Sequence, residues 1–298
     1  MAYKKRTKSK LLKTYELLSS RMDLASDDYA YYLELQKEYE GAEQFDELTE
    51  NFEGHCLILN DLQLEMRWET FQIDALHIFS DRLVLYKIVN YEGLHLWEEL
   101  KLTKVGEGVL ENPALEMLET RIRLGLQLLD WGVKMKVYGF VVYINPEFTL
   151  YNAPSDEQLL LPSQIPGYFR ELNADDALTT EQTELADRLL GLNNPDFRIR
   201  MPEYHFEQLR KGIPCSACGE LLETYSGRYQ NCGNCGKSVN VKTAIKTGIS
   251  DFRLLFPKEP VTASRMAEWC GAGKSDRVYR VLKEMYAAKG NGRKRCYV

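Results

Sequence analysis

The sequence predicts an α/β protein in which a mixed sheet with flanking helices is followed by two small C-terminal modules. Two apolar runs, Phe71–Phe79 and Leu83–Val89, are joined by a polar turn and predict a β-hairpin in the core of the sheet. An amphipathic stretch of about 18 residues from Pro113 predicts a helix, and Val137–Ile144 predicts the strand after it. A crossover helix between strands of one sheet is typical of an α/β fold.

The remaining elements of the N-terminal half follow from local signals. Residues 9–21 and 26–40 have helical apolar spacing and few helix breakers, so we expect two helices there. Cys56–Leu59 predicts the first strand of the sheet. The central helix is expected to begin after Asn112 and to end at Gly132, because Asn is a favoured N-cap and Gly a favoured helix terminator.

Breaks in these patterns divide the rest of the chain. The stretch from Pro146 to Pro166 predicts an ordered loop with little regular structure. A further helix is expected over Thr180–Leu190. We therefore expect five segments. They are an N-terminal helical segment (1–40), a central α/β domain (41–172), a helical linker (173–210), a cysteine-containing module (211–240) and a helix-turn-helix module (241–298).

Charge is distributed unevenly along the chain. The first 13 residues contain 6 Lys or Arg and no acidic residue, and residues 211–298 contain 16 Lys or Arg against 7 Asp or Glu. These two segments therefore carry net charges of +6 and +9. Since the net charge of the whole chain is −6, the part between them carries −21. Cations dominate binding to a phosphate backbone, so the two ends suit nucleic acid. The acidic body suits a protein partner, or is an ordinary solvated surface.

Composition sets the class of protein and its compartment. With 298 residues and 44% hydrophobic content, the chain can bury a substantial core. The N-terminus is basic but lacks the apolar run of a signal peptide, and no run approaches transmembrane length. We therefore expect a cytoplasmic protein without a membrane partner, whose seven cysteines are metal ligands or buried thiols. The sequence gives no signal for an oligomeric state.

The predicted strand Leu83–Val89 contains a lysine within an apolar run. Because side chains alternate along a strand, Lys87 shares one face with Leu85 and Val89. A buried ammonium is costly unless a carboxylate pairs with it. Asp74, on the preceding strand, is the candidate partner.

Two short motifs flank this lysine. Phe71–Asp74 reads FQID, and Asn90–Gly93 reads NYEG. The two motifs resemble those of the nuclease-related domain (NERD) family of Gram-positive bacterial proteins, a branch of the PD-(D/E)XK nucleases, and the resemblance extends over roughly residues 41–172. It implies a nuclease-like mixed sheet and, in the family, a metal-dependent site for phosphodiester hydrolysis.

The same resemblance predicts that this site is degenerate. The family has an E-x-K tripeptide where this chain has Lys87-Ile88-Val89, so its Glu falls on Lys87 and its Lys on Val89. The family's Gly-Glu at a helix start is replaced here by a Gly followed by Ala42. A nuclease holds Mg²⁺ with at least two carboxylates. We therefore expect no Mg²⁺ and no catalysis, with Asp74 as a remnant that pairs with Lys87 or is kept for structural reasons.

Four cysteines form two C-x-x-C pairs separated by thirteen residues, and each pair is followed by a glycine. This spacing is typical of a four-thiolate zinc ribbon. Gly219 and Gly236 permit the tight turns that direct amide N–H groups at the sulfurs. A zinc ion with four protein ligands has no open position for substrate, so its role is structural. The less favoured alternative is that the C-x-x-C pairs are redox-active. The expected ligands are Cys215, Cys218, Cys232 and Cys235.

The C-terminal residues predict a DNA-binding module. Ala263–Cys270 and Lys274–Met285 flank a Gly-Ala-Gly turn and predict a helix-turn-helix, and the tail 288–298 can close a hairpin like the wing of a winged helix. A small protein-docking domain with solvated basic residues is the alternative. The expected DNA contacts are Lys274, Ser275, Arg277, Arg280, Lys283, Arg293, Lys294 and Arg295.

Residues 271–275, with the sequence GAGKS, resemble the end of a nucleotide-binding P-loop. A complete motif requires glycine where Glu268 stands, and no apolar strand precedes it. We therefore expect no nucleotide binding.

Taken together, these patterns predict a catalytically inactive, nuclease-related protein. It is expected to associate with DNA through its zinc ribbon and helix-turn-helix, as a scaffold or regulator, and to bind a protein partner through its acidic body. A metal-dependent nuclease with a rearranged active site and a purely protein-binding adaptor are the alternatives.

Overall fold

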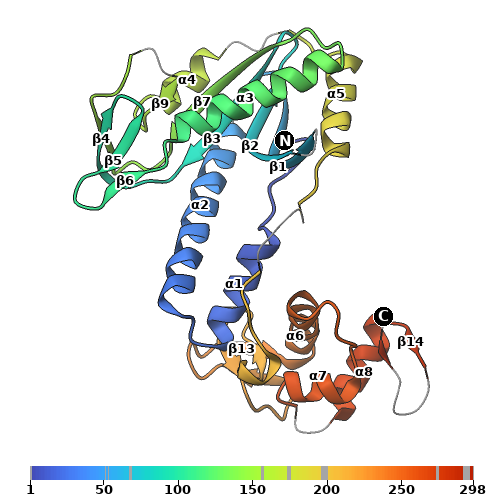
Figure 1. Ribbon diagram of the computed structural model, residues 1–298. Helices are drawn as coiled ribbons and strands as arrows, with labels where there is room; N and C mark the ends of the chain where they lie inside the picture. Colours follow the sequence, from blue (N-terminus) through green and yellow to red (C-terminus); the bar gives the residue numbers. More distant parts are fainter. Residues whose placement is uncertain are drawn as a thin grey trace. The chain divides into compact units, whose positions relative to one another are not determined.

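The computed structural model describes residues 2–50, 52, 54–66, 69–155, 158–172, 176–195, 201–272, 275–290 and 296–297 (Figure 1). The chain divides into two compact units. Unit 1 comprises Met1–Ser9 and Leu33–Ile199, and unit 2 comprises Lys10–Tyr32 and Arg200–Val298. In the described part of the chain, no helix is long and apolar enough to cross a membrane.

Unit 1 is built on a five-stranded sheet with the strand order β1-β2-β3-β7-β9. The strands β1, β2 and β3 are antiparallel neighbours, whereas β7 runs parallel to β3 and to β9. The sheet is therefore mixed, and the expected α/β class is confirmed. The expected hairpin is formed by β2 and β3. The bounds are β1 Leu57–Met66, β2 Glu69–Ile78, β3 Arg82–Val89, β7 Lys136–Tyr143 and β9 Leu159–Leu160.

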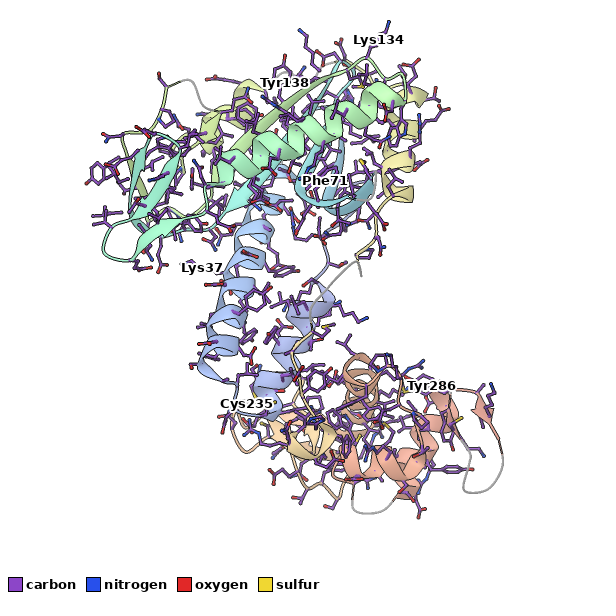
Figure 2. The ribbon with its side chains drawn as sticks, in the orientation of Figure 1. Lys37, Phe71, Lys134, Tyr138, Cys235 and Tyr286 are labelled. Atoms are coloured by element: carbon purple, nitrogen blue, oxygen red, sulfur yellow. The ribbon has the colours of Figure 1, made fainter. Side chains whose placement is uncertain are left out.

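Helices cover both faces of this sheet. Leucines of α3 (Pro113–Asp130) and α5 (Thr180–Gly191) contribute to the core on one face, and Figure 1 shows α3 lying across the strands. The other core contains residues of α2 (Ser26–Glu50), from its part in unit 1, and of α4 (Ile165–Glu171). The result is an α/β/α arrangement. Phe71 and Tyr138, labelled in Figure 2, belong to the cores on opposite faces.

The crossover helix α3 begins as its sequence predicts. The side chain of Asn112 accepts a hydrogen bond from the Ala114 amide at 3.0 Å, which satisfies one of the free N–H groups of the first turn. The helix ends at Asp130, and Gly132 follows with a positive φ of 72°. Asn112 and Gly132 are thus confirmed as the signals that set its two ends.

A second sheet in unit 1 was not anticipated from the sequence. It has four strands in the order β6-β5-β4-β8. The expectation of a loop with little regular structure from Pro146 to Pro166 is wrong in part, since this stretch contains β8, β9 and the start of α4. β8 pairs with β4, which is more than 50 residues earlier in the chain, so its ladder has no local signal. The bounds are β4 Gly93–Glu98, β5 Lys101–Lys104, β6 Gly108–Leu110 and β8 Phe148–Tyr151.

Unit 2 combines the first helix of the chain with the C-terminal third around one hydrophobic core. Three short antiparallel hairpins, β10–β11, β12–β13 and β14–β15, accompany the helices. The bounds are α1 Lys10–Arg21, β10 Ile213–Pro214, β11 Leu221–Leu222, β12 Tyr229–Asn231, β13 Ser238–Asn240, α6 Val241–Leu255, α7 Ala263–Trp269, α8 Ser275–Met285, β14 Ala288–Lys289 and β15 Cys296–Tyr297.

A buried arginine fixes α1 in this core. The guanidinium of Arg21 lies 3.8 Å from the centre of the Trp269 ring and donates to the Arg210 carbonyl at 2.9 Å. It also lies 4.0 Å from a carboxylate oxygen of Asp251. Burial lowers the pKa of Arg21 to about 10 and raises that of Asp251 to about 6. The contacts join residues almost 250 positions apart, so the sequence did not indicate them.

Candidate functional site

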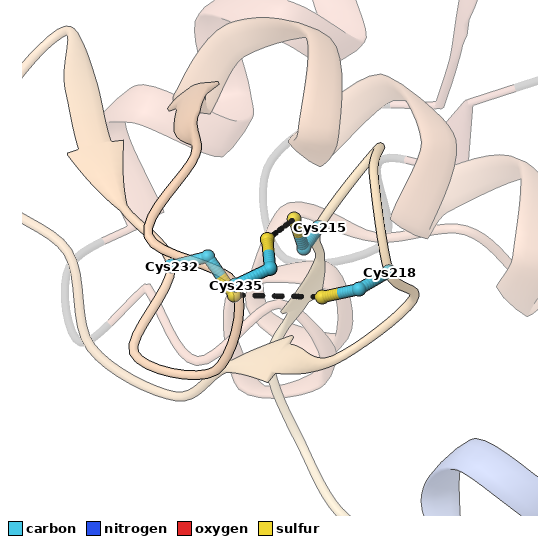
Figure 3. Close-up of side chains that lie close together, drawn as sticks. All are labelled: Cys215, Cys218, Cys232 and Cys235. Carbon is cyan, nitrogen blue, oxygen red and sulfur yellow. Dashed lines mark hydrogen bonds between the residues drawn. The ribbon is translucent and has the colours of Figure 1, made fainter.

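Four cysteines of unit 2 converge on one point (Figure 3). The strands β10 and β11 flank the first C-x-x-C pair, and β12 and β13 flank the second. The Cys215 and Cys235 sulfurs are 3.7 Å apart, and the Cys218 and Cys232 sulfurs are 3.6 Å apart. All four sulfurs lie within 4.8 Å of one another, so the four cysteines that the sequence singled out are brought together.

These distances fit a metal ion bound by four thiolates. Zn–S bonds of about 2.3 Å in a tetrahedron place the sulfurs roughly 3.8 Å apart. The amides of Gly219 and Gly236 donate to the carbonyls of Cys215 and Cys232, each at 2.9 Å, and both glycines have positive φ. No other group of three or more His, Cys, Asp or Glu ligand atoms comes this close within the described ranges. The centre could therefore hold a metal ion such as zinc.

The thiols of this centre do not titrate independently. Burial opposes ionisation of Cys215, but hydrogen bonds from the Ala217 and Cys218 amides and from neighbouring thiols lower its pKa to about 7. An amide hydrogen bond from Glu220 favours the Cys218 thiolate, yet burial and the neighbouring thiols raise the Cys218 pKa to about 11. Four sulfurs so close together cannot all be anionic without a cation between them, which is the role of a bound metal ion.

A second cluster of charged side chains lies in unit 1, around Lys87 of β3. Lys87 is on the sheet face covered by α3, as the strand alternation predicts, because Leu85 and Val89 belong to the core on that face. Its ammonium lies 3.9 Å from Asp74 Oδ2, so the expected approach to Asp74 is confirmed. It also donates to Glu116 Oε1 at 2.6 Å. This closer partner is 29 residues away on α3, and the strand pattern did not identify it.

Asp74 also has a structural contact. Its Oδ2 accepts a hydrogen bond from the Ile88 amide at 2.9 Å. The β2–β3 ladder runs only as far as the pair Ala75 and Tyr86, so beyond it the Asp74 side chain takes the place of a backbone acceptor. The two roles considered for Asp74, an ion pair with Lys87 and a structural contact, therefore occur together.

The charges of the cluster favour the ammonium form of Lys87. Burial would lower the pKa of Lys87, but the attraction of Asp74, Glu116 and Glu38 outweighs burial and raises it. Glu38 lies on α2, and desolvation raises its pKa against the opposing effect of Lys87. At neutral pH the cluster thus contains a permanent cation among carboxylates.

The other two positions named by the family resemblance are apolar and buried. Ala42 belongs to the core that contains α2, and Val89 belongs to the core that contains α3. Neither side chain has an ionisable group, so neither can bind a metal ion or move a proton.

Four of the eight expected DNA contacts lie on α8. The side chains of Ser275, Arg280 and Lys283 are exposed. Arg277, in contrast, donates to the carbonyls of Ser226 at 2.6 Å and Gly227 at 3.0 Å, so its guanidinium joins α8 to the loop before the second cysteine pair. Lys274, Arg293, Lys294 and Arg295 lie outside the described residues, as does Gly273 of the P-loop-like segment.

The elements around α8 form a compact C-terminal group. α7 and α8 pack against each other and both contact α6. The hairpin β14–β15 follows α8, and Tyr297 of β15 forms an antiparallel bridge with Val261, just before α7. The described elements of this group are thus packed helices followed by a hairpin that bonds back to the residues before α7.

Comparison with known proteins gives no relative for this chain: no protein-family model, curated protein or solved structure matches it. Any function of the chain must therefore follow from its own residues and their geometry.

Proposed function

We propose that the chain is a degenerate member of the nuclease-related (NERD) family that no longer cleaves DNA and that associates with DNA through its C-terminal modules. The observation that carries this proposal is the position of the Lys87 ammonium. It lies between Asp74 and Glu116, at distances of 3.9 Å and 2.6 Å. In a working nuclease of this superfold, the resemblance implies a divalent metal ion bound by carboxylates at this place.

An ammonium in this position disfavours metal binding for two reasons. It already pairs with Asp74 and Glu116, so a divalent ion would have to displace it, and its charge repels an incoming cation. The expected catalytic lysine is replaced by Val89, which is buried. Water therefore has neither a metal ion nor a base-positioning amine to activate it.

The C-terminal residues support a role in binding nucleic acid. We assign the four-cysteine centre to a structural zinc ion, because the sulfur spacing suits zinc and no position is left open for substrate. The group α6, α7, α8 and β14–β15 is consistent with a winged helix, in which α8 would be the recognition helix. Its exposed Arg280 and Lys283 suit phosphate contacts. The acidic body is then available to a protein partner.

One observation favours the alternative function, a nuclease with a rearranged active site. Glu38, Asp74 and Glu116 all act electrostatically on Lys87, so carboxylates surround the place where metal would bind. Their oxygens, however, do not form one of the groups close enough to hold an ion among the described residues.

A cleavage assay distinguishes these functions. Purified protein is incubated with supercoiled and linear DNA in Mg²⁺ or Mn²⁺, beside an Asp74→Ala variant. We expect no products from either protein. Time-dependent cleavage by the parent chain that is lost in Asp74→Ala would reject the proposal and favour the rearranged nuclease.

An electrophoretic mobility assay tests DNA binding separately. The Arg280→Glu/Lys283→Glu variant is expected to weaken binding at least about tenfold and to reduce its salt dependence, because phosphate contacts release counterions. Lys134→Glu/Lys136→Glu, at exposed positions of unit 1, is the control with the same change of charge. Equal retardation of both variants would exclude α8 as the DNA contact, and no retardation of the parent chain would favour a protein-binding adaptor.

A further inference from the structure

The outward face of α3 carries a row of exposed apolar side chains. Their exposed fractions range from 40% to 72%. The opposite face of the same helix packs on the sheet through Met117, Leu124 and Leu128. The exposed row consists of Leu115, Leu118, Ile122, Leu126 and Leu129.

A row of this kind is unusual on a surface helix. A helix that covers a sheet normally has one apolar face and a polar face toward water, whereas a helix apolar on both faces is normally covered on both. Single exposed leucines need no explanation, but a contiguous apolar row on a rigid element is typical of an interaction surface. The row extends over about four helical turns, or roughly 21 Å at 1.5 Å per residue.

The spacing of the row is symmetric about Ile122. The intervals are 3, 4, 4 and 3 residues, so Leu118 and Leu126 lie four residues to either side of Ile122, and Leu115 and Leu129 lie seven. A second copy of α3, packed antiparallel, would therefore place Ile122 against Ile122, Leu118 against Leu126 and Leu115 against Leu129. A two-fold interface requires this kind of self-complementarity.

A glycine beside the row supports the approach of a second helix. Gly125 lies in the middle of α3, where glycine destabilises a helix by about 1 kcal/mol relative to alanine. A Cβ atom at this position would meet no heavy atom within 4 Å, so packing within the chain does not require glycine. On the helix surface Gly125 is adjacent to Ile122 and Leu129, and the absence of a side chain lets a neighbouring helix come close.

Charge beside the row also fits a second copy. Glu119 and Arg123 flank it on one side and lie 3.5 Å apart within the chain. In the antiparallel arrangement that side of one helix meets the same side of the other. Arg123 of one copy then comes within a turn of Glu119 of the other, which gives two equivalent ion pairs across the axis.

We propose that α3 is a homodimer interface, in which two copies of this chain pack their α3 helices antiparallel about a two-fold axis at Ile122. Five partly exposed side chains bury less than the roughly 800 Å² per partner of a standard interface. The dimer is therefore concentration-dependent, with a dissociation constant on the order of micromolar. This inference is independent of the proposed function.

Analytical ultracentrifugation of the full chain tests the proposal, over about 1 to 100 µM. We expect the average mass to rise from monomer to dimer across this range. Ile122→Glu, which sets two carboxylates against each other at the axis, should raise the dissociation constant at least about tenfold. Leu48→Glu is the matched control, since it places the same charge at an exposed leucine of α2. A parent chain that stays monomeric throughout would overturn the proposal.

Cysteine cross-linking tests the orientation of the helices. An Ile122→Cys chain should form a disulfide-linked dimer on mild oxidation, beyond any background from the parent chain. A Leu115→Cys chain should not, because the two sites lie roughly 20 Å apart in the antiparallel arrangement. A mixture of Leu115→Cys and Leu129→Cys chains should form the mixed dimer. Cross-linking of Leu115→Cys to itself would indicate parallel helices and overturn the antiparallel interface.

Discussion

The cysteine centre of unit 2 and the Lys87 cluster of unit 1 both bring groups of negative charge together, but they balance that charge in different ways. At the cysteine centre four sulfurs lie within 4.8 Å of one another, and a bound metal ion would supply the balancing cation. At the Lys87 cluster the cation is a side chain of β3, bonded to Glu116 at 2.6 Å.

The difference predicts that the two units depend on their surroundings to different degrees. A group of thiolates needs a metal ion from solution, so the stability of unit 2 is linked to metal concentration. A carboxylate cluster that contains its own ammonium needs no ion. The Lys87 cluster would then contribute only to the stability of unit 1.

Metal removal is expected to have the largest effect. Complete chelation, or Cys232→Ser, should unfold most of unit 2, because Cys215 and Cys232 belong to the same core as α6, α7 and α8. The apparent binding energy of structural zinc in small peptides is on the order of 10 kcal/mol. Hydrogen exchange should show lost protection in α6 and retained protection in β3. Elemental analysis verifies that the metal has been removed. Unchanged protection in α6 after this removal would show that unit 2 does not depend on a metal ion.

Replacement of the buried arginine tests whether unit 2 also depends on a cation of its own. Arg21→Met should destabilise unit 2 by roughly 3 kcal/mol, because it removes the cation that faces Asp251 and the stacking on Trp269. Denaturant unfolding of the metal-loaded chain measures the effect. Lys13→Met, at an exposed position of the same helix, is the control and should leave the midpoint unchanged. Equal effects of the two variants would show that the Arg21 contacts contribute little.

Replacement of Lys87 should have a smaller effect, on unit 1 alone. Lys87→Met leaves Asp74 and Glu116 without their cation, and since the Lys87 side chain is still 26% exposed we expect a loss of about 1–2 kcal/mol. Addition of Asp74→Asn to this variant should recover part of the loss, because one of the unpaired charges is removed. Urea unfolding followed by hydrogen exchange in β2 and β3 measures both. A fully additive double variant would show that the ammonium and the carboxylate do not interact.

The smallest effect near neutral pH concerns a buried histidine. His77 is fully buried among Phe45, Phe79 and Tyr86, and burial lowers its pKa to about 3, against about 6.5 in the unfolded chain. The unfolded state therefore binds the proton more readily, and the stability of unit 1 should fall as the pH decreases from 6.5 toward 3. The slope approaches about 1.4 kcal/mol per pH unit for one proton. His77→Phe should show a shallower slope, whereas an unchanged slope would exclude His77 as its source.

Much of the fold could be predicted from local patterns. The hairpin of β2 and β3, the capped start of α3 at Asn112 and the helices α7 and α8 each have a sequence signal within a few residues of the element. The second sheet and the burial of Arg21 have no such local sequence signal. β8 pairs with β4, and Arg21 stacks on Trp269, so each depends on a partner far away in the chain.

The candidate sites follow the same division. The C-x-x-C pairs specified the cysteine centre because the ligands of each pair are three residues apart and a glycine turn directs both inward. Of the two carboxylates that contact Lys87, the sequence predicted only the one on the neighbouring strand. Asp74 could be assigned from strand alternation, but Glu116 is brought to Lys87 by the packing of α3 on the sheet. Arg277 was expected to contact DNA, and no sequence signal indicated that its guanidinium donates hydrogen bonds to the carbonyls of Ser226 and Gly227.

The sequence by itself determined the α/β class, the face of β3 on which Lys87 lies and the four cysteines that come together, because each depends on spacing along one element or one turn. Only the tertiary structure decided which carboxylate binds Lys87, how α1 enters the core of unit 2 and which face of α3 stays exposed. These depend on contacts between distant segments, and their free energies come from packing and burial that no local pattern records.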